Sequence, residues 1–87
     1  MKGVVYILKS EKGRYYVGST DTMERRMYQH SLGHTQTTRN FKKYTLVLTQ
    51  TYNSLTEARS VERKIKRMKR KDYIEKMVTD GYIAIKP

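Results

Sequence analysis

The first twenty residues carry the clearest strand pattern in the chain. Residues 4–8 are aromatic or aliphatic without alternation, which is typical of a strand over residues 3–8 that is covered on both faces. Residues 10–13 are turn formers, and Gly13 is free to take a positive φ. Residues 14–19 then return as a second strand, so the whole segment predicts a β-hairpin.

Helical spacing replaces the strand pattern after the hairpin. Asp21 can cap a helix over residues 22–32, in which Met23 and Met27 lie one turn apart on the buried face. The following residues, 34–43, are polar and basic, and we expect them to form a loop.

A third strand and two helices complete the pattern. Residues 44–52 are rich in Tyr, Val and Thr and predict a strand. Residues 54–57 form a capping box that opens a long helix to about Lys71, and residues 73–78 indicate a shorter helix. This order predicts one α+β domain over residues 1–87, with a three-stranded antiparallel sheet flanked by helices (β-β-α-β-α-α).

Charge narrows the range of partners. Nineteen Lys and Arg against eight Asp and Glu give a formal net charge of +11, which is unfavourable for a compact domain unless a polyanion offsets it. Nucleic acid is the leading candidate, because each neutralised phosphate releases counterions. A basic membrane-surface protein is the alternative, but Trp is absent and Phe occurs once, which disfavours membrane binding.

Cysteine usage and the N-terminal sequence limit the chemistry and the location. The chain has no cysteine and two histidines, so thiolate zinc sites are excluded and a hard cation on oxygen ligands is favoured. The N-terminal apolar run is too short for a signal peptide, and no segment has the roughly 20 apolar residues of a membrane helix. We therefore expect a cytoplasmic protein.

Three polar residues fall at the rim of the predicted core. Arg26 and His30 are four residues apart beside the methionine stripe of the first helix, and Glu62 lies at the edge of the apolar stripe of the long helix. A half-buried carboxylate needs a partner, because burying an unpaired charge is costly. For Glu62 that partner is either Lys66, four residues further on, or a metal ion.

The ordered set of these residues resembles the GIY-YIG nuclease family. Val4-Val5-Tyr6 is similar to the first family motif and Tyr16-Val17-Gly18 to the second, about ten residues later. An arginine and a histidine follow on the first helix at Arg26 and His30, and Glu62 matches the family's glutamate on a later helix. The resemblance runs from about residue 3 to residue 74 and looks most like the small stand-alone bacterial branch, which is similar to the nuclease domain of structure-selective endonucleases.

The resemblance implies a role for each matched side chain. Glu62 would bind a single divalent cation, Mg²⁺ or Mn²⁺, and Arg26 would stabilise charge on the phosphoryl oxygens. Tyr6 would orient or deprotonate the attacking water, Tyr16 would hydrogen-bond the water or the phosphate, and His30 would position one of them or shuttle a proton. Read without the resemblance, Tyr6 and Tyr16 are core aromatics with a hydroxyl at a wet edge, and His30 is structural.

Departures from the family pattern are few. Val4 replaces the glycine and Val17 the isoleucine for which the motifs are named. Ser19 follows Gly18 where the excision-repair branch usually carries lysine, which argues against close kinship with that branch. Some members also have an asparagine after the long helix, and no equivalent is found here, so metal binding would rest on Glu62 alone.

Two basic segments are expected to contact phosphates. One is the predicted loop over residues 34–43, where the alternative to phosphate contact is a loop that is simply solvated. Its candidate residues are Thr38, Arg39, Lys42 and Lys43. The other is the end of the long helix, where the candidates are Lys66, Arg67, Lys69 and Arg70.

Taken together, these features predict a metal-dependent DNA endonuclease that hydrolyses phosphodiester bonds. By the resemblance alone, branched, nicked or single-stranded DNA, a role in DNA repair or recombination and a protein partner that supplies specificity are expected. The alternative is a non-catalytic module that keeps the fold and binds DNA or RNA. The presence of Tyr6, Arg26 and Glu62 together favours the enzyme, and DNA is favoured over RNA as the substrate.

Overall fold

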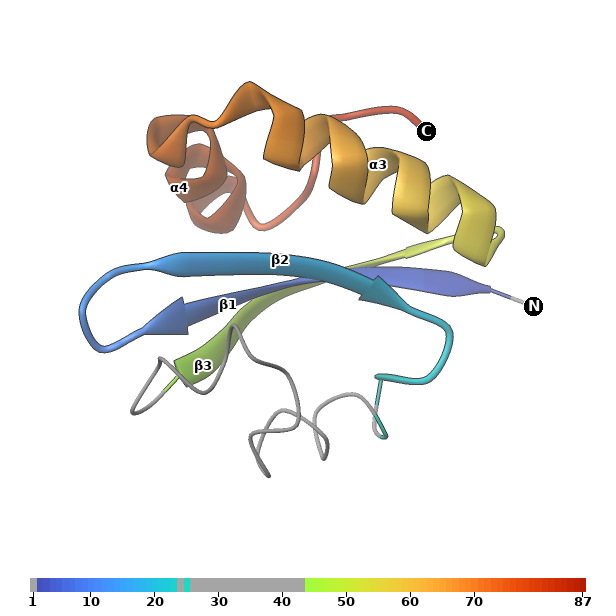
Figure 1. Ribbon diagram of the computed structural model, residues 1–87, viewed down its shortest axis with the longest axis horizontal. Helices are drawn as coiled ribbons and strands as arrows, with labels where there is room; N and C mark the ends of the chain where they lie inside the picture. Colours follow the sequence, from blue (N-terminus) through green and yellow to red (C-terminus); the bar gives the residue numbers. More distant parts are fainter. Residues whose placement is uncertain (1, 24, 26–43) are drawn as a thin grey trace.

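Three strands and two helices form two layers in the computed structural model, which describes residues 2–23, 25 and 44–87 (Figure 1). The elements are β1 (Gly3–Ser10), β2 (Tyr15–Thr20), β3 (Tyr44–Tyr52), α3 (Leu55–Met68) and α4 (Lys71–Asp80). The strands make an antiparallel sheet in the order β2-β1-β3, and α3 and α4 both lie over the same face of it. The predicted α+β class and the three-stranded antiparallel sheet are confirmed.

The boundaries of the strands differ slightly from those predicted. β1 continues two residues beyond the predicted Leu8, because Lys9 still pairs with both neighbouring strands and Ser10 still pairs with β3. β2 is displaced by one residue at each end, because Arg14 takes part in the turn. β3 has the predicted bounds. The predicted helix over residues 22–32 lies mostly outside the described residues, and the predicted loop over residues 34–43 lies wholly outside them.

Alternation along the strands sorts their side chains between the two faces of the sheet. Tyr6 pairs with Gly18, and Leu8 pairs with Tyr16, so these four positions share one face. Their neighbours in sequence point to the other face, beneath the helices, where the core is formed by Val5, Ile7, Val17, Leu48, Ala58, Val61, Ile65, Met77 and Ile83. β1 is therefore buried on both faces, as its unbroken apolar run predicts.

α3 is fixed at its N-terminus by a cap and by a close backbone contact. The Ser54 hydroxyl accepts a hydrogen bond from the backbone N–H of Glu57 at 3.1 Å, and the Glu57 carboxylate accepts one from the backbone N–H of Asn53 at 3.1 Å. A Cβ atom at Gly3 would lie 2.6 Å from the Cα of Leu55, so only glycine lets α3 approach β1 this closely. The predicted cap is thus confirmed, with Glu57 reaching one residue further back than in the usual capping box.

The long helix ends earlier than the sequence predicts. α3 ends at Met68 and Lys69 takes a left-handed conformation (φ 51°), so Lys71 begins α4 instead of closing α3. The turn lets Met77 of α4 pack on the same core as α3, whereas a continuous helix would carry it past the sheet. Neither described helix is long and apolar enough to cross a lipid bilayer.

Candidate active site at the edge of β2

The first tyrosine of the candidate site lies across a glycine. Tyr6 is fully buried, and its ring extends from β1 over Gly18 of β2, so that a Cβ atom at position 18 would overlap the Tyr6 hydroxyl. Gly18 has no side chain to prevent this, and the hydroxyl therefore reaches the outer strand of the described sheet. The glycine of the second motif is explained by this contact and not by an unusual backbone angle, because its φ is not positive.

The second tyrosine lies beside the first on the same face of the sheet. The ring centroids of Tyr6 and Tyr16 are 6.2 Å apart, and the ring planes are inclined by 43°. Tyr16 is half-buried, unlike Tyr6. Lys66 reaches down from α3 around the edge of β2, so that its Nζ lies 5.8 Å from the Tyr16 centroid. Lys66 thus joins the face that carries the tyrosines to the face covered by the helices.

The carboxylate of Glu62 is held from two sides. The Ser19 hydroxyl on β2 donates a hydrogen bond to its Oε1, and the Nζ of Lys66 lies 2.6 Å from its Oε2. The Glu62 side chain is 20% exposed and that of Lys66 51% exposed, so the ion pair lies at the rim of the interface between α3 and β2. The pairing of Glu62 with Lys66 that the sequence left open is therefore present, and Ser19 adds a partner from 43 residues earlier in the chain.

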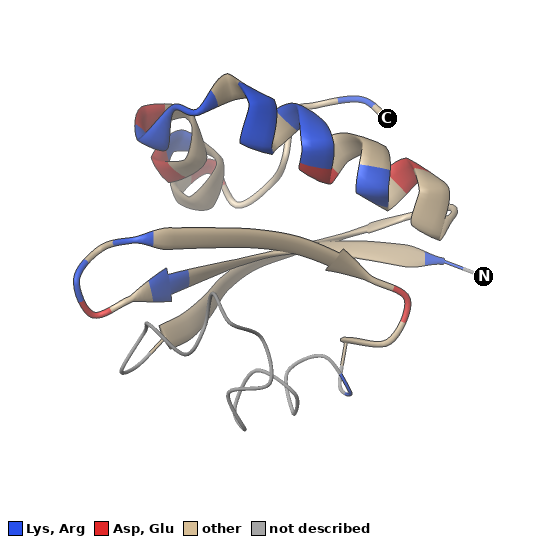
Figure 2. Ribbon diagram, viewed as in Figure 1, with Lys and Arg blue, Asp and Glu red and all other residues tan. Residues whose placement is uncertain are grey.

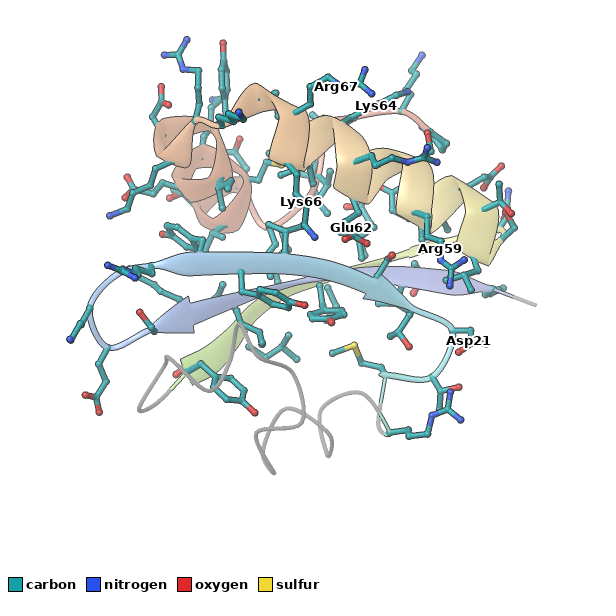
Figure 3. The ribbon with its side chains drawn as sticks, in the orientation of Figure 1. Asp21, Arg59, Glu62, Lys64, Lys66 and Arg67 are labelled. Carbon is teal, nitrogen blue, oxygen red and sulfur yellow. The ribbon has the colours of Figure 1, made fainter. Side chains whose placement is uncertain are left out.

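The basic residues of α3 point in two directions. Figure 3 shows Lys66 and Glu62 extending from α3 toward β2, whereas Lys64 and Arg67 extend away from the sheet. Lys64 instead donates a hydrogen bond at 2.8 Å to the backbone carbonyl of Lys86 near the C-terminus. Of the four basic residues predicted at the end of this helix, Lys66, Lys69 and Arg70 therefore border the β2 side and Arg67 does not.

The donor set at Glu62 suits a hard cation. No group of three or more His, Cys, Asp or Glu side chains that could enclose a metal occurs among the described residues. A single rim carboxylate is nevertheless a sufficient protein ligand for Mg²⁺, which keeps several waters and takes phosphate oxygens from its substrate. The residues present therefore fit a cation that binds together with the nucleic acid, and Glu62 would hold it.

Several predicted site residues lie outside the described part of the chain. These are Arg26 and His30 of the predicted first helix and Thr38, Arg39, Lys42 and Lys43 of the predicted loop. The site that the structure does bring together comprises Tyr6, Tyr16 and Glu62, and it adds Ser19 and Lys66 as the partners of the carboxylate.

Ser19 is the contact that the sequence did not reveal. Alternation along β2 places it on the same face as Val17, beneath the helices, so its side of the sheet could be inferred. Its partner could not, because the pairing depends on how far along β2 the helix α3 lies.

Comparison with known proteins identifies the family of this chain. Residues 2–77 match the GIY-YIG catalytic domain family. The chain is 37% identical over 70 residues to a UPF0213 protein of Streptococcus pneumoniae, covering 79% of this chain and 71% of that protein. It is 34% identical over 67 residues to a UPF0213 protein of Halobacterium salinarum, covering 76% of this chain and 87% of that one.

A solved structure gives the same answer for the fold. The solution NMR structure of a UPF0213 protein from Bacillus halodurans is similar to this chain with a TM-score of 0.59 and 30% sequence identity, covering 93% of this chain and 87% of that one. The chain belongs to the GIY-YIG family, which is a nuclease superfamily. These relatives carry the UPF0213 name, which states no activity.

Proposed function

We propose that this protein is a divalent-metal-dependent endonuclease that hydrolyses phosphodiester bonds in DNA at the edge of β2. The observation that carries the proposal is the position of Glu62, whose carboxylate is held at the rim of the α3–β2 interface by Ser19 and Lys66. Lys66 also lies over the ring of Tyr16, which links the carboxylate to the tyrosine pair of the family motifs.

Each side chain has a role that its geometry supports. A divalent cation bound at Glu62 would supply Lewis-acid stabilisation of charge on the phosphate and the leaving oxygen. Ser19 fixes the orientation of Glu62 by its hydrogen bond to Oε1, so that Oε2 is the atom that exchanges partners. Lys66 neutralises Oε2 in the ion pair, and with a cation held at Glu62 its ammonium would be available to a phosphate oxygen.

The two tyrosines have different roles toward the attacking water. Tyr16 is half-buried and lies next to the Lys66 ammonium, so its hydroxyl is suited to hydrogen-bond the attacking water or the phosphate. Tyr6 is fully buried against Gly18, and by the family resemblance it would orient or deprotonate that water. Arg26 and His30 keep the roles implied by the family resemblance, stabilising phosphoryl charge and positioning a proton.

One observation favours a second candidate function. The Glu62–Lys66 ion pair satisfies the carboxylate without any metal, as it would in a non-catalytic module that binds nucleic acid through its basic surface. The two candidates differ in whether Glu62 is needed for anything beyond binding.

The deciding experiment is cleavage of labelled duplex, flap and branched DNA in Mg²⁺ or Mn²⁺, with a chelator control. We expect the wild type to cut only with metal, and Glu62→Gln and Arg26→Ala to lose at least about 100-fold in rate, because each removes a group that acts on the phosphate. Asp80→Asn, which removes an exposed carboxylate at the end of α4, is the matched control and should cut at the wild-type rate.

The opposite result has a clear meaning. Salt-sensitive binding without cutting of any DNA, unchanged by Glu62→Gln and Arg26→Ala, would replace the nuclease by the binding module. Cutting or binding confined to RNA of the same sequence would overturn DNA as the substrate.

A further inference from the structure

A groove runs from the β1–β2 hairpin to the junction between α3 and α4. It has a volume of about 620 Å³. One end of the groove adjoins the candidate active site, because Tyr16 and Lys66 belong to the site and also line the groove. At the other end the hairpin turn closes on α4, where a Cβ atom at Gly13 would lie 3.6 Å from the Nζ of Lys71. The groove is therefore bounded by two segments that are 58 positions apart in sequence.

The rim of the groove is strongly cationic. Among the described residues its lining includes no carboxylate but five basic side chains, which are Arg14, Lys66, Lys69, Arg70 and Lys71. Figure 2 shows this concentration at the hairpin, along α3 and at the α3–α4 turn. The left-handed conformation of Lys69 makes this turn, and so brings the end of one helix and the start of the next to the same rim.

Not all of these cations are neutralised by neighbours. Lys66 is paired with Glu62 at 2.6 Å and Arg70 with Asp72 at 2.8 Å, while Lys71 lies 3.9 Å from Glu75. Within the part of the chain that the structure describes, neither Arg14 nor Lys69 takes part in an ion pair. The rim therefore keeps a positive potential that suits a chain of phosphates.

The floor of the groove has the opposite character. It is formed by apolar side chains of β2, α3 and α4, namely Val17, Ile65 and Ile74, together with the ring of Tyr15, while Tyr16 lines the groove at the edge of β2. Both rings have an ammonium nearby, since the Nζ of Lys9 lies 5.6 Å from the Tyr15 centroid and that of Lys66 lies 5.8 Å from the Tyr16 centroid. Apolar and aromatic surface below and cations above is the arrangement on which proteins bind unpaired nucleotides.

The shape of the site selects unpaired nucleotides over a duplex. A duplex presents phosphates on a convex surface and keeps the faces of its bases stacked inside, so it needs only a basic surface and cannot use an apolar floor. The volume of the groove is in the range of ligand pockets, which suits bases that have left the stack. Arg67 and Lys64, by contrast, lie outside the groove and extend away from the sheet, so the apolar floor is not beside them.

We infer that this groove binds unpaired nucleotides of a DNA substrate immediately beside the phosphate held at Glu62. Phosphates of the unpaired strand contact Arg14 and Lys69, and a base lies on Tyr15 and the apolar floor. The substrate is then DNA in which a duplex passes into a single-stranded tail. The link to cleavage rests on the proposed function, whereas binding of the tail does not.

The test measures binding by fluorescence anisotropy in a metal-free buffer at fixed ionic strength. The probes are a labelled blunt duplex and the same duplex with an oligothymidine tail. We expect the wild type to bind the tailed duplex roughly tenfold more tightly than the blunt one, which is the size of the effect of stacking about one base. Equal dissociation constants for the two probes would overturn the inference.

Matched variants separate the groove from general charge. Arg14→Ala with Lys69→Ala removes one arginine and one lysine from the groove, and Lys64→Ala with Arg67→Ala removes the same two charges from the opposite side of α3. Both doubles should weaken binding of the blunt duplex to a similar extent, but only the groove double should lose most of the preference for the tail. Loss of that preference in the control double as well, or its survival in the groove double, would contradict the assignment.

A third variant tests the aromatic floor without a change of charge. Tyr15→Leu keeps an apolar side chain where Tyr15 packs beside the core, so the domain should stay folded by circular dichroism, and the preference for the tail should fall severalfold. If a folded Tyr15→Leu protein kept the full preference for the tailed duplex, the proposal that a base lies on Tyr15 would be wrong. Tighter binding of an oligouridine RNA tail than of the DNA tail would overturn the choice of DNA.

The same probes distinguish this inference from the nuclease proposal. Metal-dependent cutting without a preference for the tail would reject the groove and leave the nuclease. A preference for the tail that depends on Arg14 and Lys69, without cutting of any DNA, would leave the groove and reject the nuclease.

Discussion

The two flanks of the helical layer carry polar side chains of very different kinds. On the β3 side, the Gln50 amide donates to the Ile83 carbonyl at 3.0 Å and accepts from the Ile83 N–H at 2.7 Å, which fastens the C-terminal segment to the sheet. On the β2 side, Glu62 is held by Ser19 and Lys66 at a rim that is open to solvent. One flank is closed by neutral groups and the other is left open with charged ones.

The two flanks differ in how readily their polar groups can change partners. Gln50 and Ile83 satisfy one another completely, and Gln50 also donates to the Tyr52 hydroxyl at 2.8 Å, so exchange of partners would leave buried groups unpaired. Burial raises the pKa of the Tyr52 hydroxyl, and the hydrogen bond from Gln50 offsets part of that rise. Glu62 and Lys66 can exchange partners at little cost, because both remain within reach of water.

The largest contrast is expected from removing the central group of each flank. Glu62→Gln should lower cleavage at least about 100-fold with little change in Tm, because the amide can still accept the hydrogen bond from Ser19 and an ion pair at the rim stabilises by at most about 1 kcal/mol. Gln50→Leu should leave cleavage at low temperature unchanged and destabilise the fold by about 1–3 kcal/mol, since the Ile83 groups lose their partner. Thermal unfolding followed by circular dichroism measures the stability of each variant, and the cleavage assay measures its activity. If both variants lost stability and cleavage to the same extent, the two flanks would not differ in function.

The glycines within the two strands of the hairpin, Gly3 and Gly18, should give the next largest contrast. A Cβ atom at Gly18 meets the end of a side chain, that of Tyr6, whereas one at Gly3 meets the backbone of α3 at Ser54 and Leu55. Gly18→Ala should therefore displace the Tyr6 hydroxyl and lower cleavage by roughly 10- to 100-fold. Gly3→Ala should instead destabilise the fold by about 1–3 kcal/mol with cleavage kept, because α3 itself must move. Wild-type cleavage by Gly18→Ala would show that the position of Tyr6 is immaterial.

A smaller effect is expected from Lys66→Met, which keeps an apolar stem beside Tyr16 but removes the ammonium from Oε2 of Glu62. With this competitor gone, Mn²⁺ should bind up to about fivefold more tightly, the equivalent of an exposed ion pair of about 1 kcal/mol. Electron paramagnetic resonance of free Mn²⁺ measures this without turnover. Unchanged or weaker Mn²⁺ binding would mean that Lys66 does not occupy the position of the cation.

The smallest effect concerns the ion pair at the rim of the groove. Asp72 accepts a hydrogen bond from Arg70, which holds the pKa of the Asp72 carboxyl below its usual value. The pair therefore stabilises the fold when the pH is above the pKa of this carboxyl in the unfolded chain. This contribution is lost as the pH falls through the pKa of the carboxyl in the folded protein. Asp72→Asn should lower Tm slightly at neutral pH, and the difference from the wild type should vanish in strong acid. A difference in Tm that persists in strong acid would assign the effect of Asp72 to something other than its charge.

Local sequence patterns determined most of the elements and the surface on which each residue lies. Three features depend only on neighbours a few residues away and could therefore be predicted from the sequence. They are the apolar run in β1, the Ser54 cap and the spacing of Ala58, Val61 and Ile65. The end of α3 was not, since residues 69 and 70 include neither glycine nor proline and the turn there follows from packing α4 on the shared core.

The sequence by itself therefore determined that this protein has a basic α+β domain of the GIY-YIG family, and its resemblance to that family predicted Tyr6, Tyr16 and Glu62 as site residues. Only the tertiary structure decided that Ser19 and Lys66 hold Glu62, and that the hairpin and the α3–α4 turn enclose a groove beside it. The reason is physical. Periodicity fixes the face on which a side chain lies, but contacts between distant segments depend on how closely α3 approaches β1 at Gly3 and on where the helix turns at Lys69.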